Sequence, residues 1–293
     1  MQLLDGKLLS ANIKAELAAE VEQMQRSGER PPHLVAVLVG ENPASQVYVA
    51  SKIRSCAEVG YKSTRIQRDA SLSEAELLEI VRQLNDDPEV DGILVQLPLP
   101  KHIREENITL AIDHRKDVDG FHPVNIGRMT QGLAAYLPAT PYGIMEMLRR
   151  YNIETAGKHC VVVGRSNIVG TPMSILLSRK GYPGDCTVTL THSRTQNLAE
   201  EVRRADIIVA AIGIPEFVKG DWVKPGAVII DVGINRIEDA SRKSGQRLVG
   251  DVDFEAASKN CSYITPVPGG VGLMTVTALL MNTLKARKGE VYG

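Results

Sequence analysis

Apolar runs of strand length alternate with longer segments of helical periodicity along most of this chain, and no other feature restricts the fold as strongly. Buried strands separated by amphipathic helices are the pattern of a parallel sheet with crossover helices. We therefore predict an α/β fold built on parallel sheets. The expected strands are LVAVLVG (34–40), KSTRIQR (62–68), GILVQL (92–97), CVVVG (160–164), TVTLT (187–191), IIVAAIG (207–213), AVIIDVG (227–233) and YIT (263–265).

The pattern breaks once, in the stretch DHRKDVDGFHPVNIGRMTQGLAAYLPATP, which is rich in Asp, Gly, Pro and Asn. A chain of 293 residues suggests two domains at roughly 150 residues each. We place the first domain at residues 1–139 and the second at 140–275, and we expect the last helix, 276–293, to pack back onto the first. No segment of the sequence repeats another.

Composition excludes several classes of function. The net charge of −1 gives no electrostatic reason to bind nucleic acid or an anionic membrane. No stretch approaches the ~18 apolar residues of a membrane span, and the N-terminus lacks the pattern of a secretion signal. The chain is therefore expected to be cytoplasmic. Its four cysteines lack metal-site spacing and are expected to be buried thiols rather than disulfide partners or zinc ligands.

The segment KHCVVVGRSNIVGTP has the order strand, glycine loop, helix that binds a dinucleotide. A predicted strand runs into Gly164, and a helix opens near Gly170 with Pro172 in its first turn. The usual G-x-G-x-x-G spacing is absent, so the alternative is a plain tight turn in a parallel sheet. Phosphate binding at the helix N-terminus is the better interpretation.

The next strand indicates which nicotinamide cofactor fits. NAD-specific sites usually end this strand with an acid that holds the ribose 2′-hydroxyl. Here the strand ends in THSRT, without an acid, and Ser193 and Arg194 with Arg165 offer donors for a 2′-phosphate. NADP is therefore favoured, although exposed arginines are also common as solvated surface groups.

Unusual polar residues follow the first long strand, where ligands of open α/β sheets bind. Asn42 and Pro43 suit the N-cap and first turn of a helix. On that helix Ser45, Tyr48 and Lys52 would share one face beside an apolar stripe. Alternatively, the tyrosine and lysine are ordinary helix neighbours.

Tyr48 and Lys52 also have the spacing of the Tyr-x-x-x-Lys pair of short-chain dehydrogenases. In those enzymes the pair follows the nucleotide-binding strands of the same domain. Here it precedes the Gly164 turn by more than a hundred residues, so we do not assign it that role.

Further candidates lie in later loops. Gln96 stands in an apolar strand and needs a partner, either a ligand or the backbone. Asp117 and Asp119 form either a turn or part of a site, and two acids alone are too few for a metal. The loop ITPVPGGVGLMT (264–275) is a rigid connection or a place where backbone approaches a ligand. None of the six histidines is paired with a nucleophile, so none is assigned chemistry.

Six stretches together resemble the bifunctional methylenetetrahydrofolate dehydrogenase/methenyltetrahydrofolate cyclohydrolase family nearly from end to end. They are VGENPASQVYVASKIRSCAEVG, DGILVQLPLP, KDVDGFHPVN, PATPYG, VVVGRSNIVGTP and PVPGGVG. The chain departs from the family pattern at Ala139, where members often carry Cys, and at Leu273, where they usually carry Pro.

The resemblance implies a folate-binding catalytic domain, then a Rossmann-like NADP domain, with a cleft between them, in a homodimer. It implies Lys52 as the catalytic lysine, Gln96 as its partner, Tyr48 as the residue that packs on the pterin, and Asp119 as the acid that holds it. The implied substrate-binding residues also include Ser45, Pro266, Gly269 and Gly270. The implied cofactor-binding residues are Gly164, Arg165, Ser166, Val169, Gly170, Ser193, Arg194, Gly213 and Ile234.

The implied chemistry fits this set of residues. Hydride loss from 5,10-methylenetetrahydrofolate requires positioning rather than a base, because no proton leaves. Hydrolysis of the methenyl product to 10-formyltetrahydrofolate does require proton transfer, for which Lys52 is the candidate. Such a lysine needs a lowered pKa, to which burial and a neutral Gln96 would contribute while Asp119 would oppose it. Another two-domain NADP dehydrogenase of the shikimate type and a nucleotide-sensing regulator are the alternatives.

Overall fold

The computed structural model describes residues 1–241 and 245–292 and divides the chain into two compact units. The catalytic unit, as we call it here, comprises Ala11–Ala139 and Val276–Gly293. The nucleotide unit comprises Met1–Ser10 and Thr140–Thr275. In the described part of the chain, no helix is both long enough and apolar enough to cross a membrane.

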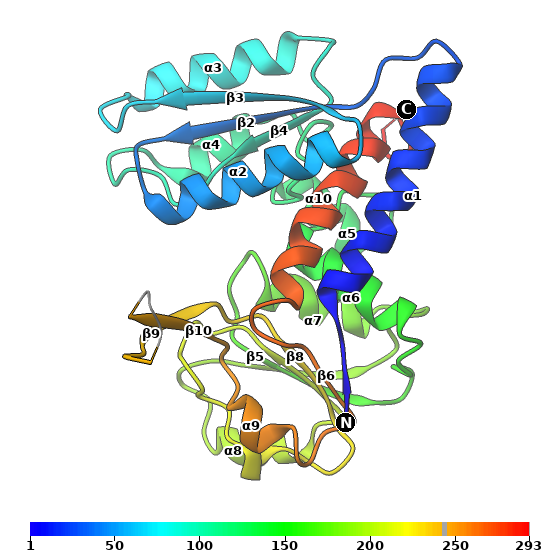
Figure 1. Cartoon of the computed structure of the whole chain (residues 1–293), viewed down its shortest axis with the longest axis vertical. Coiled ribbons are helices and arrows are strands. Elements are labelled where there is room, and N and C mark those ends of the chain that lie inside the picture. The colour runs from blue at the N-terminus through cyan, green and yellow to red at the C-terminus, as the bar shows by residue number, and fades with distance from the viewer. Residues whose placement is uncertain (242–244, 293) are drawn as a thin grey trace. The chain divides into compact units, whose positions relative to one another are not determined.

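The catalytic unit is built on a three-stranded parallel sheet in the order β3-β2-β4. Its strands are β2 (His33–Val39), β3 (Lys62–Arg68) and β4 (Gly92–Val95). Figure 1 shows α2 and α3 on opposite faces of this sheet. The helices are α2 (Pro43–Glu58), α3 (Glu74–Asp86), α4 (Glu105–Ala111) and α5 (Pro123–Thr130), with parts of α1 (Gly6–Arg26) and α10 (Val271–Arg287).

Alternation along β2 explains this layering. Val35, Val37 and Val39 point to one face, where they pack in a core that includes Leu77 and Val81 of α3. The intervening residues of β2 are also buried, because every position of this strand is covered. A central parallel strand covered on both faces is therefore apolar throughout, which is why its sequence is so strongly predictive.

The nucleotide unit is a six-stranded parallel sheet in the order β1-β11-β8-β7-β5-β6. Chain order reverses at β5, since β6 lies on one side of it and β7 on the other. The sheet strands are β1 (Gln2–Leu3), β5 (His159–Val163), β6 (Thr187–Thr191), β7 (Ile207–Ala210), β8 (Val228–Asp231) and β11 (Tyr263–Ile264); β9 (Asn235–Glu238) and β10 (Gln246–Val249) form an antiparallel hairpin. The helices are α6 (Ala139–Arg150), α7 (Gly170–Ser178), α8 (Leu198–Arg204), η1 (Gly220–Trp222) and α9 (Phe254–Ala257).

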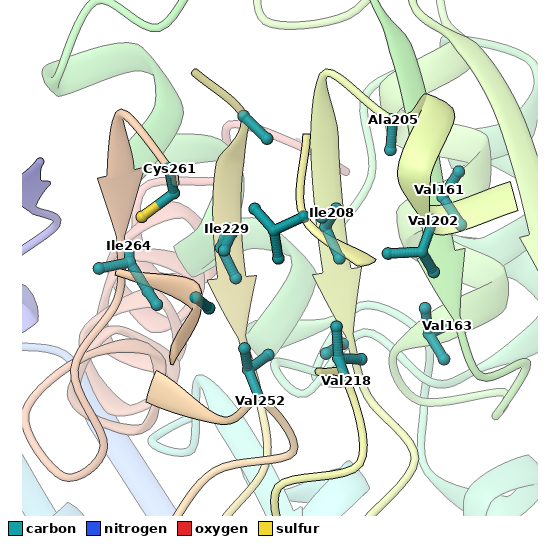
Figure 2. Close-up of a cluster of buried hydrophobic side chains, with 14 residues drawn as sticks. Val161, Val163, Val202, Ala205, Ile208, Val218, Ile229, Val252, Cys261 and Ile264 are labelled. Atoms are coloured by element: carbon teal, nitrogen blue, oxygen red, sulfur yellow. The ribbon is translucent and has the colours of Figure 1, made fainter. Parts of the chain in front are cut away.

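One face of this sheet carries the hydrophobic cluster drawn in Figure 2. Val161, Ile208 and Ile229 occupy matching positions on three adjacent strands. Val202 of α8 and Ala257 of α9 pack onto the same cluster, and both are fully buried. These helices cover the sheet and leave the carboxyl ends of its strands for the loops described below.

The structure corrects the predicted first domain at its N-terminus. Residues 1–10 lie in the nucleotide unit, because Gln2 and Leu3 pair in parallel with Tyr263 and Ile264 and so extend that sheet. A two-residue edge strand carries no periodicity that a sequence could reveal. The hairpin strands β9 and β10 were not predicted either, because their charged, half-exposed residues lack an apolar run.

The two central strands begin in the same way, although the sequence shows no repeat. A histidine opens each strand, its backbone N–H donates to an aspartate just before one neighbouring strand, and its imidazole Nε2 contacts a threonine of the other neighbour. At β2, the N–H of His33 donates to Oδ2 of Asp91 at 2.8 Å, and its Nε2 lies 2.9 Å from Oγ1 of Thr64. At β5, the N–H of His159 donates to Oδ2 of Asp206 at 2.9 Å, and its Nε2 lies 2.9 Å from Oγ1 of Thr189. The two units thus share a βαβαβ plan, and these histidines are structural.

Candidate functional site

Helix α2 places Lys52 because it begins directly after β2. Asn42 caps the helix by accepting the N–H of Ser45 at 3.1 Å, and Pro43 occupies the first turn. Ser45, Val49 and Lys52 then fall on the buried side of the helix, and Lys52 is only 8% exposed. A lysine buried to this degree needs partners for its ammonium or a neutral amine.

Gln96 supplies that partner. It follows the last residue of β4, where its backbone N–H still donates to the carbonyl of Val37 at 2.9 Å. Nζ of Lys52 donates to Oε1 of Gln96 at 3.1 Å, and Nε2 of Gln96 donates to the carbonyl of Leu97 at 2.7 Å. The amide is therefore oriented with its oxygen toward the lysine.

The surroundings of Lys52 disfavour its charged form. Burial lowers the pKa of Lys52 below the ordinary lysine value, and the Asp119 carboxylate opposes this effect without reversing it. Burial likewise raises the pKa of Asp119, with Lys52 opposing. The two groups are thus close enough to interact, and each is pushed toward its uncharged form.

Asp117 shapes the loop that carries Asp119. Its carboxylate accepts the N–H groups of Phe121 at 3.2 Å and His122 at 2.8 Å, and the Nδ2 of Asn125 at 2.9 Å. Burial raises the pKa of Asp117 to about 7. Asp117 therefore stabilises a turn, which was one of the two interpretations of this acidic pair. Within the described residues, no group of three or more His, Cys, Asp or Glu side chains could hold a metal ion.

Tyr48, by contrast, is 40% exposed and lies one turn before Lys52 on α2. The structure thus brings Lys52, Gln96 and Asp119 together and leaves a tyrosine ring accessible on the same helix. Ser45 is buried near the start of this helix.

In the nucleotide unit, the turn after β5 is tightly built. Gly164 has a φ of +112°, and a Cβ there would lie 2.2 Å from the carbonyl oxygen of Ala211. A Cβ at Gly170 would lie 2.0 Å from the carbonyl oxygen of Gly164. Oγ of Ser166 accepts the N–H of Val169 at 3.2 Å and that of Gly170 at 3.4 Å. Only glycine fits these two positions, and the turn leads into α7 as a dinucleotide turn requires.

The loops after β5 and β6 lie at the same edge, because these strands are adjacent and parallel. Arg165, Ser193 and Arg194 are all exposed there. The second loop is held by its own side chains, since Nδ1 of His192 accepts the N–H of Arg194 at 3.1 Å. These residues fit a phosphate-bearing ribose, with charged donors on both loops.

The remaining predicted residues also follow strands of this unit. Gly213 follows β7 with a φ of +69°, and Ile234 follows β8 and is 46% exposed. Pro266, Gly269 and Gly270 lie between β11 and α10. Gly6 was not predicted as a site residue, and it lies against this loop. A Cβ on Gly6 would lie 2.1 Å from the carbonyl oxygen of Gly270, so the start of α1 approaches the loop closely.

Comparison with known proteins finds two family models that match successive parts of the chain. The family model of the tetrahydrofolate dehydrogenase/cyclohydrolase catalytic domain matches residues 4–119, and that of the NAD(P)-binding domain matches residues 138–291. The chain belongs to the tetrahydrofolate dehydrogenase/cyclohydrolase family.

Individual relatives of the family are similar over their full length. The bifunctional protein FolD of Flavobacterium johnsoniae is 61% identical, covering 98% of each chain, and that of Bacteroides fragilis is 56% identical, covering all of both. Among solved structures, FolD from Campylobacter jejuni has a TM-score of 0.93 at 47% identity, covering 99% of each chain. The Trypanosoma brucei enzyme, complexed with NADP cofactor and inhibitor, has a TM-score of 0.92 at 39% identity, covering 99% of this chain and 98% of that one.

Membership of this family confirms three predictions: the family itself, the pairing of dehydrogenase with cyclohydrolase activity, and NADP as cofactor. The parallel α/β fold in two units is confirmed as well. The shikimate-type and regulator alternatives are set aside.

Proposed function

We propose that Lys52 carries the proton in the cyclohydrolase reaction of this bifunctional enzyme. The observation that supports this most is the burial of Lys52 against the neutral Gln96, with its pKa lowered. A lysine with an ordinary pKa would be almost fully protonated at neutral pH and could not accept a proton from water.

The dehydrogenase step requires the protein to position the folate and the nicotinamide, and it requires no base. A hydride leaves the methylene bridge of 5,10-methylenetetrahydrofolate, and the cation that remains is shared by two nitrogens of the folate. Bound NADP supplies the acceptor for that hydride. Tyr48 offers a ring face for the flat pterin, and Asp119 offers an acceptor for pterin N–H groups.

The cyclohydrolase step needs one group that takes and returns a proton. Water adds to the methenyl carbon and loses a proton, which the neutral amine of Lys52 accepts. The lysine ammonium then protonates the nitrogen that leaves as the ring opens. The hydroxyl proton of the intermediate passes to solvent as the formyl C=O forms, giving 10-formyltetrahydrofolate and one released proton. Gln96 keeps Nζ in place without contributing a charge that would hold the proton on the lysine.

The loops after β5 and β6 support the cofactor assignments. We propose that the Gly164–Gly170 turn, with Ser166 and Val169, approaches the pyrophosphate of the cofactor at the N-terminus of α7. The 2′-phosphate is assigned to Arg165, Ser193 and Arg194, and contacts along the rest of the cofactor to Gly213 and Ile234. The folate roles of Ser45, Pro266, Gly269 and Gly270 stay predictions.

We also propose that the catalytic unit binds the folate, and that the enzyme acts as a homodimer in the cytoplasm. The family resemblance supports these proposals. Light scattering of the purified protein tests the dimer, and a monomeric mass at assay concentration would exclude it.

The experiment that tests the role of Lys52 compares both activities in one variant. Lys52→Met keeps the size of the buried side chain but cannot transfer a proton. We expect the cyclohydrolase rate to fall by about a hundredfold or more, with a smaller effect on NADPH formation from methylenetetrahydrofolate. Lys62→Met, on the exposed strand β3, is the matched control and should leave both rates unchanged. Equal retention of both activities in Lys52→Met would remove Lys52 from this role.

A further inference from the structure

Two buried aspartates lie at the carboxyl ends of β7 and β8, and neither the dehydrogenase nor the cyclohydrolase step uses them. Asp231 is the last residue of β8 and is 3% exposed, while Asp251 follows β10 and is fully buried. Both carboxylates accept backbone N–H groups. These two side chains therefore fix the backbone conformation of the segments to which they are hydrogen-bonded.

Asp251 holds the loop that follows β7. Its Oδ2 accepts the N–H of Ile212 at 2.7 Å and that of Gly213 at 2.9 Å, and its Oδ1 accepts Nδ2 of Asn235 at 2.9 Å. Gly213 and its neighbour Ile214 are exposed. The carboxylate thus fixes, from the buried side, a loop whose outer side is accessible.

Asp231 in turn holds Asp251. Its carboxylate accepts the backbone N–H groups of Asp251 and Val252, each at 2.9 Å. It also accepts the N–H of Gly233 at 2.9 Å, at the start of the loop that carries Ile234. The carboxylate of Asp231 therefore connects the loop after β8 to the segment after β10 that carries Asp251.

Glycines provide the space for this arrangement. A Cβ at Gly250 would lie 1.8 Å from Oδ2 of Asp231, and a Cβ at Gly233 would lie 2.3 Å from Oδ1 of Asp251. These two carboxylates fit only because their neighbours have no side chain. The glycines and the aspartates thus form one structural unit.

We propose that Asp251, supported by Asp231, is a positioning residue for NADP binding. It acts through the backbone of Ile212 and Gly213 and does not touch the cofactor itself. This inference rests on the proposed function, because Gly213 and Ile234 are assigned to the cofactor only there. Backbone N–H groups bound to a carboxylate are more firmly oriented than those bound to a neutral acceptor.

Asp251→Asn tests the proposal because the amide cannot satisfy all three donors. One end of the carboxylate faces two backbone N–H groups and the other faces Nδ2 of Asn235. With Asn235 as it stands, either orientation of the new amide sets its NH2 against a donor. Asn235 cannot relieve this by turning over its own amide, because its oxygen would then face the carbonyl of Gly250, to which Nδ2 donates at 3.2 Å. We expect the dissociation constant for NADP to rise by about tenfold or more.

The cyclohydrolase activity separates this effect from a folding defect. Hydrolysis of methenyltetrahydrofolate needs no hydride acceptor, so it is measured without NADP. We expect kcat and KM of that reaction to stay at wild-type values in Asp251→Asn. Asp253→Asn, two residues later, is the matched control: that side chain caps α9 by accepting the N–H of Ala256, which asparagine does equally well.

The double variant Asp251→Asn/Asn235→Asp provides a rescue. The oxygen of residue 251 can then face the loop while its NH2 donates to the new carboxylate. The bond from residue 235 to the carbonyl of Gly250 is lost, so NADP binding should return part of the way to the wild-type value. If the single variant does not fold, Asn235→Leu removes only one donor to Asp251 and should weaken NADP by about threefold. Unchanged NADP binding there would overturn the proposal.

Two further results would overturn it. Wild-type NADP affinity in a folded Asp251→Asn protein would do so, as would a parallel loss of cyclohydrolase activity. Gly213→Ala distinguishes this failure from failure of the cofactor assignment, since alanine is disfavoured at the positive φ of this position. Weakened NADP binding in Gly213→Ala with normal binding in Asp251→Asn contradicts only the role of Asp251. Normal binding in both contradicts the assignment of Gly213.

Discussion

The amine of Lys52 donates a 3.1 Å hydrogen bond to the side-chain oxygen of Gln96, and the nitrogen of that same amide is held by the carbonyl of Leu97. The partner of the buried lysine is therefore neutral and fixed in orientation. Asp119 is the charged group that raises the pKa of this lysine, and burial outweighs it. The catalytic unit thus keeps the amine in place, and burial disfavours its charge more than Asp119 favours it.

Gln96→Glu tests the importance of a neutral partner. A carboxylate at this position would stabilise the ammonium and raise the pKa of Lys52. We expect cyclohydrolase activity at pH 7 to fall by about tenfold or more, and the rising limb of its pH profile to move to higher pH. Gln67→Glu, on the exposed side of β3, should change neither. A pH profile identical to that of the wild type would exclude this role for Gln96.

Tyr48 is expected to act through its ring. Tyr48→Phe keeps the ring and should leave the KM for the folate substrate within about twofold, whereas Tyr48→Ala should raise it by about tenfold, as loss of an aromatic contact does. Both variants should bind NADP as the wild type does. An equal KM in the alanine and phenylalanine variants would show that the ring does not contact the pterin.

Arg165 is expected to select NADP over NAD. Arg165→Ala removes a charged donor from the proposed 2′-phosphate site, so NADP should bind about 10- to 100-fold more weakly, while NAD, which lacks that phosphate, should be little affected. Isothermal titration with both cofactors measures this difference. Lys180→Ala, an exposed charge removal after α7, is the control. The phosphate assignment fails if both cofactors weaken equally.

Asp117 predicts a pH dependence of stability. Its pKa is raised from 3.8 to about 7 in the folded protein. The folded state therefore binds the proton more tightly than the unfolded chain does, and this contribution is fully present below about pH 4 and is lost as the pH rises through about 7. Asparagine resembles the protonated acid and does not titrate. The free energy of unfolding of the wild type minus that of Asp117→Asn should fall between pH 4 and pH 7, and a constant difference would contradict the raised pKa.

The sequence predicted the central strands well because strands such as β2 and β5 are buried on both faces and hence apolar throughout. The edge strand β1 and the hairpin β9–β10 were missed, since short or half-exposed strands carry no such run. The turn at Gly164 could be recognised because its sequence must carry glycine at positions 164 and 170. At both positions a backbone carbonyl lies too close for a side chain.

The supporting residues of both sites could not be predicted in the same way. Asp231 and Asp251 are twenty residues apart and meet only because β8 and the segment after β10 come together in the fold. Lys52 and Gln96 are 44 residues apart, and their pairing depends on the position of α2 against β2 and β4. The family resemblance implied this pairing, and the structure contains the hydrogen bond. Residue type and spacing alone could not give it, because the hydrogen bond is a property of the tertiary structure.

The protonation state of Lys52 is the most direct test of the proposed chemistry. Protein labelled with ¹³C at the lysine Cε carbons can be titrated by NMR, and the signal absent from Lys52→Met assigns Lys52. We predict that this signal titrates at lower pH than the value of about 10.4 for a free lysine, and that its midpoint rises in Gln96→Glu. A midpoint at or above the free-lysine value would contradict a neutral Lys52 as the proton carrier.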